Sequence, residues 1–118
     1  PLGVVEIVPS GGVYDYAHKY TVGQTAYHAP AELDEALAKC LREQARTAFE
    51  ACGCRDFARA DFILAEDGTP FFLEINTIPG LTPTSLLPKS ASCMGYNFEE
   101  LAWRMAAPAC KRYKLETA

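Results

Sequence analysis

The chain has 118 residues, 49% of them hydrophobic and 22% charged, which predicts one globular domain and excludes a disordered or low-complexity chain. Eleven basic and fifteen acidic residues give a formal net charge of −4 without a dense basic cluster, which argues against general nucleic-acid binding. The longest apolar runs, such as 62–65 and 71–73, are far shorter than the roughly 20 residues that cross a bilayer, so the sequence also argues against a membrane protein.

The five cysteines are odd in number and lack the paired spacing of a zinc site. We therefore expect reduced thiols and a cytoplasmic protein. The chain starts at Pro1 with neither a methionine nor a signal-peptide pattern, and an apolar run follows at once. This favours a piece of a longer protein.

The first expected element is a strand over residues 4–8, which is rich in β-branched side chains and runs into the turn sequence of residues 9–12. Residues 14–20 combine polar and aromatic side chains without a regular period, so we expect a mobile surface loop there. A short stretch from Gly23 to Pro30 completes this region.

A helix is expected over residues 32–52, because apolar residues recur there at spacings of three and four. These residues are Leu33, Leu37, Leu41, Ala45, Ala48 and Cys52. Glu32, Asp34 and Glu35 lie where the helix dipole favours negative charge. Gly53 can adopt the left-handed conformation that ends a helix.

A β-hairpin is expected next, from the apolar runs 55–65 and 70–76 and the Asp-Gly turn between them. After a turn at 77–80, residues 82–85 lead into a short helix that Gly95 ends. A last helix then follows a capping-box pair, Asn97 and Glu100.

The hairpin should have one polar and one apolar face, because side chains alternate along a strand. A two-residue or four-residue turn places Asp61 directly opposite Glu74. The polar face then holds Arg59, Asp61, Phe72, Glu74 and Asn76. The apolar face holds Ala58, Ala60, Phe62, Leu64, Phe71, Leu73 and Ile75, and we expect it to pack on the 32–52 helix. One mainly antiparallel sheet should include this hairpin and the 4–8 strand.

Two carboxylates opposite each other in a sheet repel, so a positive charge should lie between Asp61 and Glu74. With the Asn76 carbonyl they offer the hard oxygen ligands that suit Mg²⁺, which usually completes its shell with water and phosphate oxygens. This pattern points to a nucleotide phosphate. The alternative is an ordinary solvated face on which Arg59, Asp61 and Glu74 form local ion pairs.

Three segments in order, 14–20, 59–61 and 74–80, together with 5–7 and the 81–86 loop, resemble the carboxy-terminal part of the D-alanine–D-alanine ligases. The resemblance covers nearly all of residues 1–118. It implies an α+β fold, the carboxy-terminal subdomain of an ATP-grasp ligase, with a mainly antiparallel sheet flanked by helices.

The resemblance also implies the chemistry of the whole protein. ATP phosphorylates the carboxylate of one D-alanine, the amine of a second D-alanine attacks the acyl phosphate, and the dipeptide enters peptidoglycan. ATP and two Mg²⁺ ions, with Mn²⁺ as a substitute, would be the cofactors. The parent would be a cytoplasmic homodimer that binds neither nucleic acid nor membrane.

By the same resemblance, Asp61, Glu74 and Asn76 would hold the two metal ions on the ATP phosphates. Arg59 would steady the acyl phosphate and the tetrahedral intermediate.

Five further residues receive roles from the resemblance. Lys19 would reach the transferred phosphoryl group from the 14–20 loop, and Tyr20 would help to close that loop. The backbone N–H of Gly80 would stabilise the oxyanion. Ser85 and Leu86, which open a helix, would bind the carboxylate of the second D-alanine.

The residues leave several alternatives open. The parent could be a D-alanine–D-lactate or D-alanine–D-serine ligase, because the residues that choose the nucleophile are spread over several loops. The chain could also be a non-catalytic nucleotide-binding module or a structural interaction domain. We expect residues 1–118 alone to be inactive, since the resemblance places the adenine site and the first D-alanine site upstream.

Overall fold

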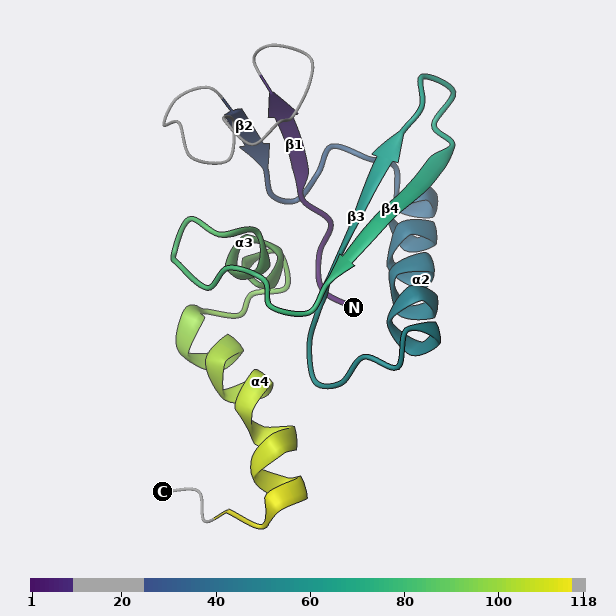
Figure 1. The fold of residues 1–118 in the computed structure, drawn as a ribbon. Coiled ribbons are helices and arrows are strands. Elements are labelled where there is room, and N and C mark those ends of the chain that lie inside the picture. The colour runs from purple at the N-terminus through teal and green to yellow at the C-terminus, as the bar shows by residue number, and fades with distance from the viewer. Residues whose placement is uncertain (10–24, 116–118) are drawn as a thin grey trace.

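The structure is a computed structural model that describes residues 1–9 and 25–115, in which a pair of strands, a helix, a second pair of strands and two helices follow one another (Figure 1). In chain order they are β1 (Glu6–Pro9), β2 (Thr25–His28), α2 (Glu35–Ala51), β3 (Arg59–Leu64), β4 (Pro70–Asn76), α3 (Leu86–Ser92) and α4 (Phe98–Tyr113). The expected α+β class is thus confirmed. Across residues 1–9 and 25–115, none of the helices has the length and hydropathy of a membrane-spanning segment.

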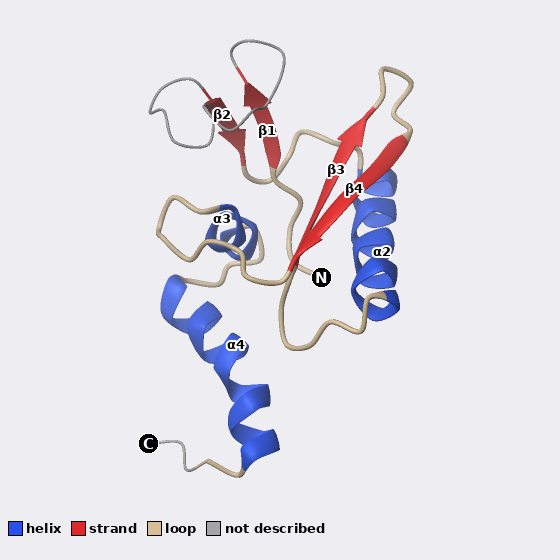
Figure 2. Ribbon diagram, viewed as in Figure 1, coloured by secondary structure: helices blue, strands red, loops and turns tan. Residues whose placement is uncertain are grey.

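The strands form two separate antiparallel pairs, β1 with β2 and β3 with β4 (Figure 2). The expectation of one sheet that joins the 4–8 strand to the hairpin was therefore wrong for the part of the chain described. Instead β1 pairs with β2, and Glu6 lies opposite His28. Each pair joins neighbouring strands, so both pairings are local. The β2 strand has only four residues, too few for a period to stand out in the sequence.

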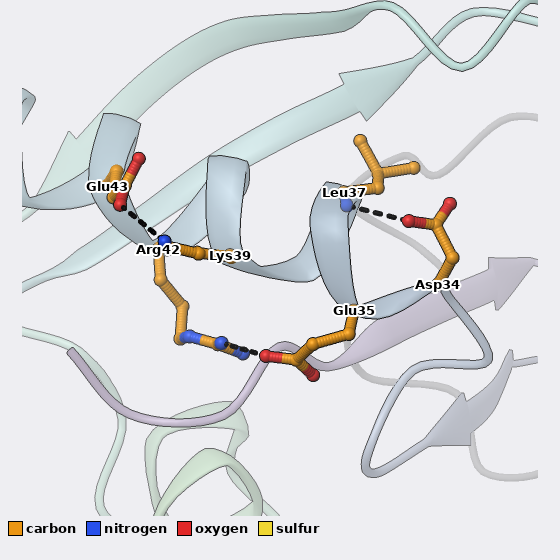
Figure 3. Close-up of polar contacts among 6 residues, drawn as sticks. All are labelled: Asp34, Glu35, Leu37, Lys39, Arg42 and Glu43. Carbon is orange, nitrogen blue, oxygen red and sulfur yellow. Dashed lines mark hydrogen bonds and ion pairs between the residues drawn. The ribbon is translucent and has the colours of Figure 1, made fainter.

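Helix α2 confirms the prediction for residues 32–52, although it begins at Glu35. The Asp34 side chain caps it, accepting a hydrogen bond of 2.9 Å from the backbone N–H of Leu37 (Figure 3). About two turns along the helix, the half-buried Arg42 pairs with the exposed Glu35 at 2.7 Å. Gly53 follows the helix with φ +62°, the left-handed conformation that its sequence position predicted. The helix lies along the β3–β4 hairpin (Figure 1).

The three buried residues of the main core cluster lie on α3 and α4. They are Leu87, Ala91 and Leu101, with Leu2, Phe57, Tyr96 and Met105 packed around them. The predicted capping box is present: Asn97 and Glu100 each accept the other's backbone N–H. The main core cluster is therefore formed by the two carboxy-terminal helices and not by the apolar face of the hairpin.

The hairpin turn differs from both predicted lengths. Gly68 donates to the Ala65 carbonyl at 2.9 Å, and Ala65 donates to the Thr69 carbonyl at 3.0 Å. The loop therefore has three residues and ends on Gly68, which has φ +81°, as in a type I turn followed by a left-handed glycine.

A β-bulge at Leu73 cancels the shift that this turn introduces. Asp61 lies opposite Glu74 as predicted, but the next pair is Phe62 with Phe72, so Leu73 has no partner. The prediction that Phe72 shares the polar face was wrong, since its ring meets that of Phe62 edge-on with centroids 5.6 Å apart. Phe71 and Leu73, predicted to be in the core, are 56% and 55% exposed.

Two of the contacts between segments distant in sequence involve α3 and α4. Gly3 donates to the Ser90 carbonyl at 3.1 Å, and the Ser90 hydroxyl donates back to the Gly3 carbonyl. The Arg112 guanidinium binds both Asp56 carboxylate oxygens, at 2.7 and 2.5 Å. These hydrogen bonds hold the pKa of Asp56 below its usual value and raise the pKa of Arg112. Through Asp56, the end of α4 is fastened to the segment before β3.

Candidate active site

The predicted polar residues gather at the end of the hairpin away from its turn. Asp61 lies opposite Glu74, and Arg59 lies opposite Asn76 in the antiparallel ladder. The structure therefore brings together four of the residues selected from the sequence. The two acidic positions face each other because the three-residue turn and the bulge at Leu73 compensate.

Arg59 brings a positive charge to Asp61 and forms with it one of the local ion pairs that the alternative interpretation of this face expects. Its Nε lies 2.7 Å from Asp61 Oδ1, and its terminal nitrogen lies 2.9 Å from Asp61 Oδ2. Their side chains are only 20% and 27% exposed, so this pair is less screened than an ordinary surface ion pair. Glu74 is exposed.

Asn76 ends β4 and sets the direction of the loop that follows. Its Oδ1 accepts a hydrogen bond of 2.9 Å from the backbone N–H of Ile78, which makes an Asx turn. A carbonyl oxygen has two lone pairs, so this oxygen can still accept one further partner. The strand end and the 77–81 loop are therefore coupled through one side chain.

The oxygen donors here suit Mg²⁺. Within residues 1–9 and 25–115, no three His, Cys, Asp or Glu side chains are grouped so that they could hold a metal ion. The oxygen atoms that this face of the hairpin offers to a metal ion are those of the Asp61 and Glu74 carboxylates and of the Asn76 amide. Magnesium is commonly bound by one or two carboxylates together with water and phosphate oxygens, so this set fits.

The loop between β4 and α3 folds back so that Gly80 meets Ser85 (Figure 1). A Cβ added to Gly80 would lie 2.8 Å from Ser85 Oγ, so a larger residue at position 80 would press on this hydroxyl. Ser85 is the N-cap residue of α3, yet its side chain makes no capping hydrogen bond. Its hydroxyl instead accepts a hydrogen bond from the loop, from the backbone N–H of Thr82. Leu86 is the first residue of the helix.

Sequence reasoning missed the hydroxyl partners of Ser85. Thr82 Oγ1 lies 2.7 Å from Ser85 Oγ and 3.3 Å from Thr84 Oγ1. The signal in the sequence was the hydroxyl-rich run 82–85, which also fits an ordinary helix start. Lys19 and Tyr20, the two site residues predicted in the 14–20 loop, lie outside the described residues.

Comparisons with known proteins agree on one family. A family model for the D-ala D-ala ligase C-terminus matches residues 2–106. The D-alanine–D-alanine ligase of Syntrophotalea carbinolica is 50% identical over 112 residues, which are 95% of this chain and 36% of that protein. The ligase of Anaeromyxobacter sp. (strain K) is 50% identical over 104 residues, 88% of this chain and 34% of the relative. The chain thus spans about a third of the length of these curated relatives.

Solved structures share the fold. The VanG D-Ala:D-Ser ligase from Enterococcus faecalis matches with a TM-score of 0.76 and 34% identity over 90% of this chain and 31% of that chain. The D-alanine–D-alanine ligase from Bacillus anthracis matches with a TM-score of 0.76 and 30% identity over 98% of this chain and 38% of that chain. The same ligase complexed with ATP gives a TM-score of 0.75. In sequence and in fold, therefore, the chain belongs to the D-alanine–D-alanine ligase C-terminus family.

Proposed function

We propose that this chain is the carboxy-terminal part of an ATP-dependent ligase that joins two D-alanines for peptidoglycan synthesis. The observation that carries the proposal is the pairing of Asp61 with Glu74 across the hairpin, with Arg59 and Asn76 beside them. The names of the relatives, D-alanine–D-alanine ligases at 50% identity, supply the substrate class. We place the reaction in the cytoplasm, and we expect the whole ligase to be a homodimer.

Each residue of the hairpin has a distinct task in this proposal. Asp61, Glu74 and Asn76 would hold two Mg²⁺ ions, which would neutralise charge on the ATP phosphates as phosphoryl transfer proceeds. The Arg59 guanidinium carries a permanent charge and several donors in a rigid fork, which suits a carboxyl phosphate. Its two hydrogen bonds to Asp61 hold the guanidinium beside the carboxylates.

The 77–86 loop would receive the second D-alanine. The backbone N–H of Gly80 would donate to the oxyanion that forms when the amine attacks the acyl phosphate. The Ser85 hydroxyl and the backbone of Leu86 would bind the substrate carboxylate. From the 14–20 loop, Lys19 would contact the transferred phosphoryl group, and Tyr20 would help to enclose it.

A D-alanine–D-serine ligase is the second candidate. The solved D-Ala:D-Ser ligase is 34% identical to this chain, against 30% for the solved D-alanine–D-alanine ligase. The curated relatives at 50% identity favour D-alanine as the second substrate.

Product analysis tests the proposal and separates these candidates. The ligase that contains residues 1–118 is incubated with ATP and D-alanine, alone or with D-serine or D-lactate, and the products are identified by mass spectrometry. We expect ADP and D-alanyl-D-alanine in equal amounts from D-alanine alone. A mixed product in preference to this dipeptide would favour the related ligases, and ATP binding without any product would favour a non-catalytic module.

A further inference from the structure

The turn before α3 holds three side-chain hydroxyls in contact, and Ser85 lies at one end of them. Thr82 and Ser85 are joined twice through the backbone, since Ser85 N–H donates to the Thr82 carbonyl at 2.9 Å and Thr82 N–H donates to Ser85 Oγ at 3.1 Å. Pro83 occupies the second position of this turn, where its fixed φ is favourable. The backbone therefore holds the three hydroxyls in place.

The donors and acceptors in this cluster limit what Ser85 can do. A hydroxyl has one proton to donate and two lone pairs to accept with. Ser85 Oγ already accepts from Thr82 N–H, and it lies 2.7 Å from Thr82 Oγ1. When Thr82 donates across this contact, both Ser85 lone pairs are used, and the Ser85 proton is left for a partner outside the cluster. That partner must be an acceptor, as a carboxylate is.

Thr84 can extend the same arrangement. Its Oγ1 lies 3.3 Å from Thr82 Oγ1, so it can donate to Thr82 while Thr82 donates to Ser85. The three hydroxyls then form a head-to-tail chain that ends at the Ser85 proton, and hydrogen bonds in such a chain polarise one another. Thr82 and Thr84 are exposed and Ser85 is half-buried, so the chain is accessible.

Two further observations show that the Ser85 hydroxyl serves this loop and not the helix. A serine at an N-cap normally accepts a backbone N–H of the first turn, but Ser85 makes no such bond. In addition, only a glycine at position 80 leaves the hydroxyl its space, since a Cβ there would lie 2.8 Å away. Gly80 and Ser85, both given roles in the reaction under the proposed function, therefore lie next to each other.

From this geometry we propose that Thr82 is a positioning residue for the second substrate, with Thr84 in support. By donating to Ser85, Thr82 makes the Ser85 hydroxyl a donor aimed at the carboxylate of the incoming amino acid. The inference rests on the proposed function, because it needs a carboxylate at Ser85. Thr82 itself touches no reacting atom.

The test uses the ligase that contains this chain, with Thr82→Val, Thr82→Ser, Ser85→Ala and the double variant. Losing one neutral hydrogen bond to Ser85 should raise the KM for the second amino acid about 5-fold in Thr82→Val. The kcat and the KM for ATP should stay near the parent values, and Thr82→Ser should restore binding. Thr47→Val, an exposed threonine on α2 that bonds only within its helix, is the matched control and should change nothing.

The double variant decides whether Thr82 acts through Ser85. If it does, Thr82→Val added to Ser85→Ala should raise the KM no further. A parent-like KM in Thr82→Val, equal effects on kcat and KM, or additive effects in the double variant would each overturn the inference. A parent-like KM in Ser85→Ala would instead overturn the substrate assignment of the proposed function, on which this inference depends. Thermal unfolding of each variant verifies that the fold is intact.

Discussion

Among single residues, Glu74 would have opposite effects on stability and on catalysis under the proposed function. It faces Asp61 across the ladder, and like charges directly opposite destabilise a sheet. Arg59 binds Asp61 through two hydrogen bonds and offsets part of this repulsion. A carboxylate kept in an unfavourable position is typical of a functional residue.

We predict that Glu74→Gln removes most ligase activity and leaves stability intact. The amide lacks the charge needed to bind metal beside phosphates, so the rate of ADP release with D-alanine should fall by a large factor. In metal-free buffer the variant should melt no lower than the parent, because the substitution relieves about 0.2–1 kcal/mol of repulsion. The matched control is Glu66→Gln, an exposed acid in the hairpin turn. Near-normal turnover in Glu74→Gln would exclude Glu74 from the metal site.

At the scale of elements, the hairpin keeps its register through a turn that requires Gly68. We predict that Gly68→Ala destabilises the protein by about 1–2 kcal/mol, because a residue with a Cβ is strained at the observed φ of +81°. Nothing lies within 4 Å of the added Cβ, so the cost arises from the backbone alone. Urea unfolding measures it, with Glu66→Ala as the control. An unchanged midpoint would mean that the turn can adopt another form.

The Asp56–Arg112 pair fastens α4 to the segment before β3, and its contribution should depend on pH. The lowered pKa of Asp56 means that its carboxylate stabilises the fold above its usual pKa of 3.8, and that this stabilisation is lost as pH falls through the lower, folded value. Arg112→Gln should therefore lower the melting temperature at neutral pH.

The difference in melting temperature between the parent and Arg112→Gln should shrink as pH falls below 3.8. Lys111→Gln removes the same charge from the neighbouring position and should show no such dependence. A difference that stays constant down to acid pH would mean that Arg112 acts through packing instead of through this ion pair.

Particular elements show what the sequence could and could not predict. The α2 helix and the capping box of α4 follow from periodicity and from cap residues. Asp61 was correctly placed opposite Glu74 because the bulge at Leu73 offsets the error in the predicted turn length. The bulge at Leu73 could not be predicted, because one unpaired residue leaves no compositional signal, and the resulting place of Phe72 was missed with it. The hydroxyl contacts of Thr82 depend on how a turn folds back, which spacing alone does not encode.

At the scale of the whole molecule, the hairpin of this chain leaves large hydrophobic side chains exposed. Ile63, Phe71 and Leu73 are each more than half exposed. The buried hydrophobic residues of the described chain are Leu41, Leu87, Ala91 and Leu101. The chain spans about a third of its relatives. Under the proposed function, catalysis would therefore belong to a longer ligase, in which the hairpin and the 77–86 loop would form one side of the site.

The transfer of oxygen from D-alanine to phosphate tests this central claim most directly. In the proposed reaction a carboxylate oxygen of the first D-alanine attacks the γ-phosphorus of ATP, and it leaves with the phosphate when the second amine attacks the carbonyl. With D-alanine labelled with ¹⁸O in both carboxylate oxygens, the ligase that contains residues 1–118 should release phosphate that carries one ¹⁸O atom, seen as an isotope shift in ³¹P NMR. The label should be lost with the activity in Glu74→Gln. Dipeptide formed together with unlabelled phosphate would contradict the acyl-phosphate route.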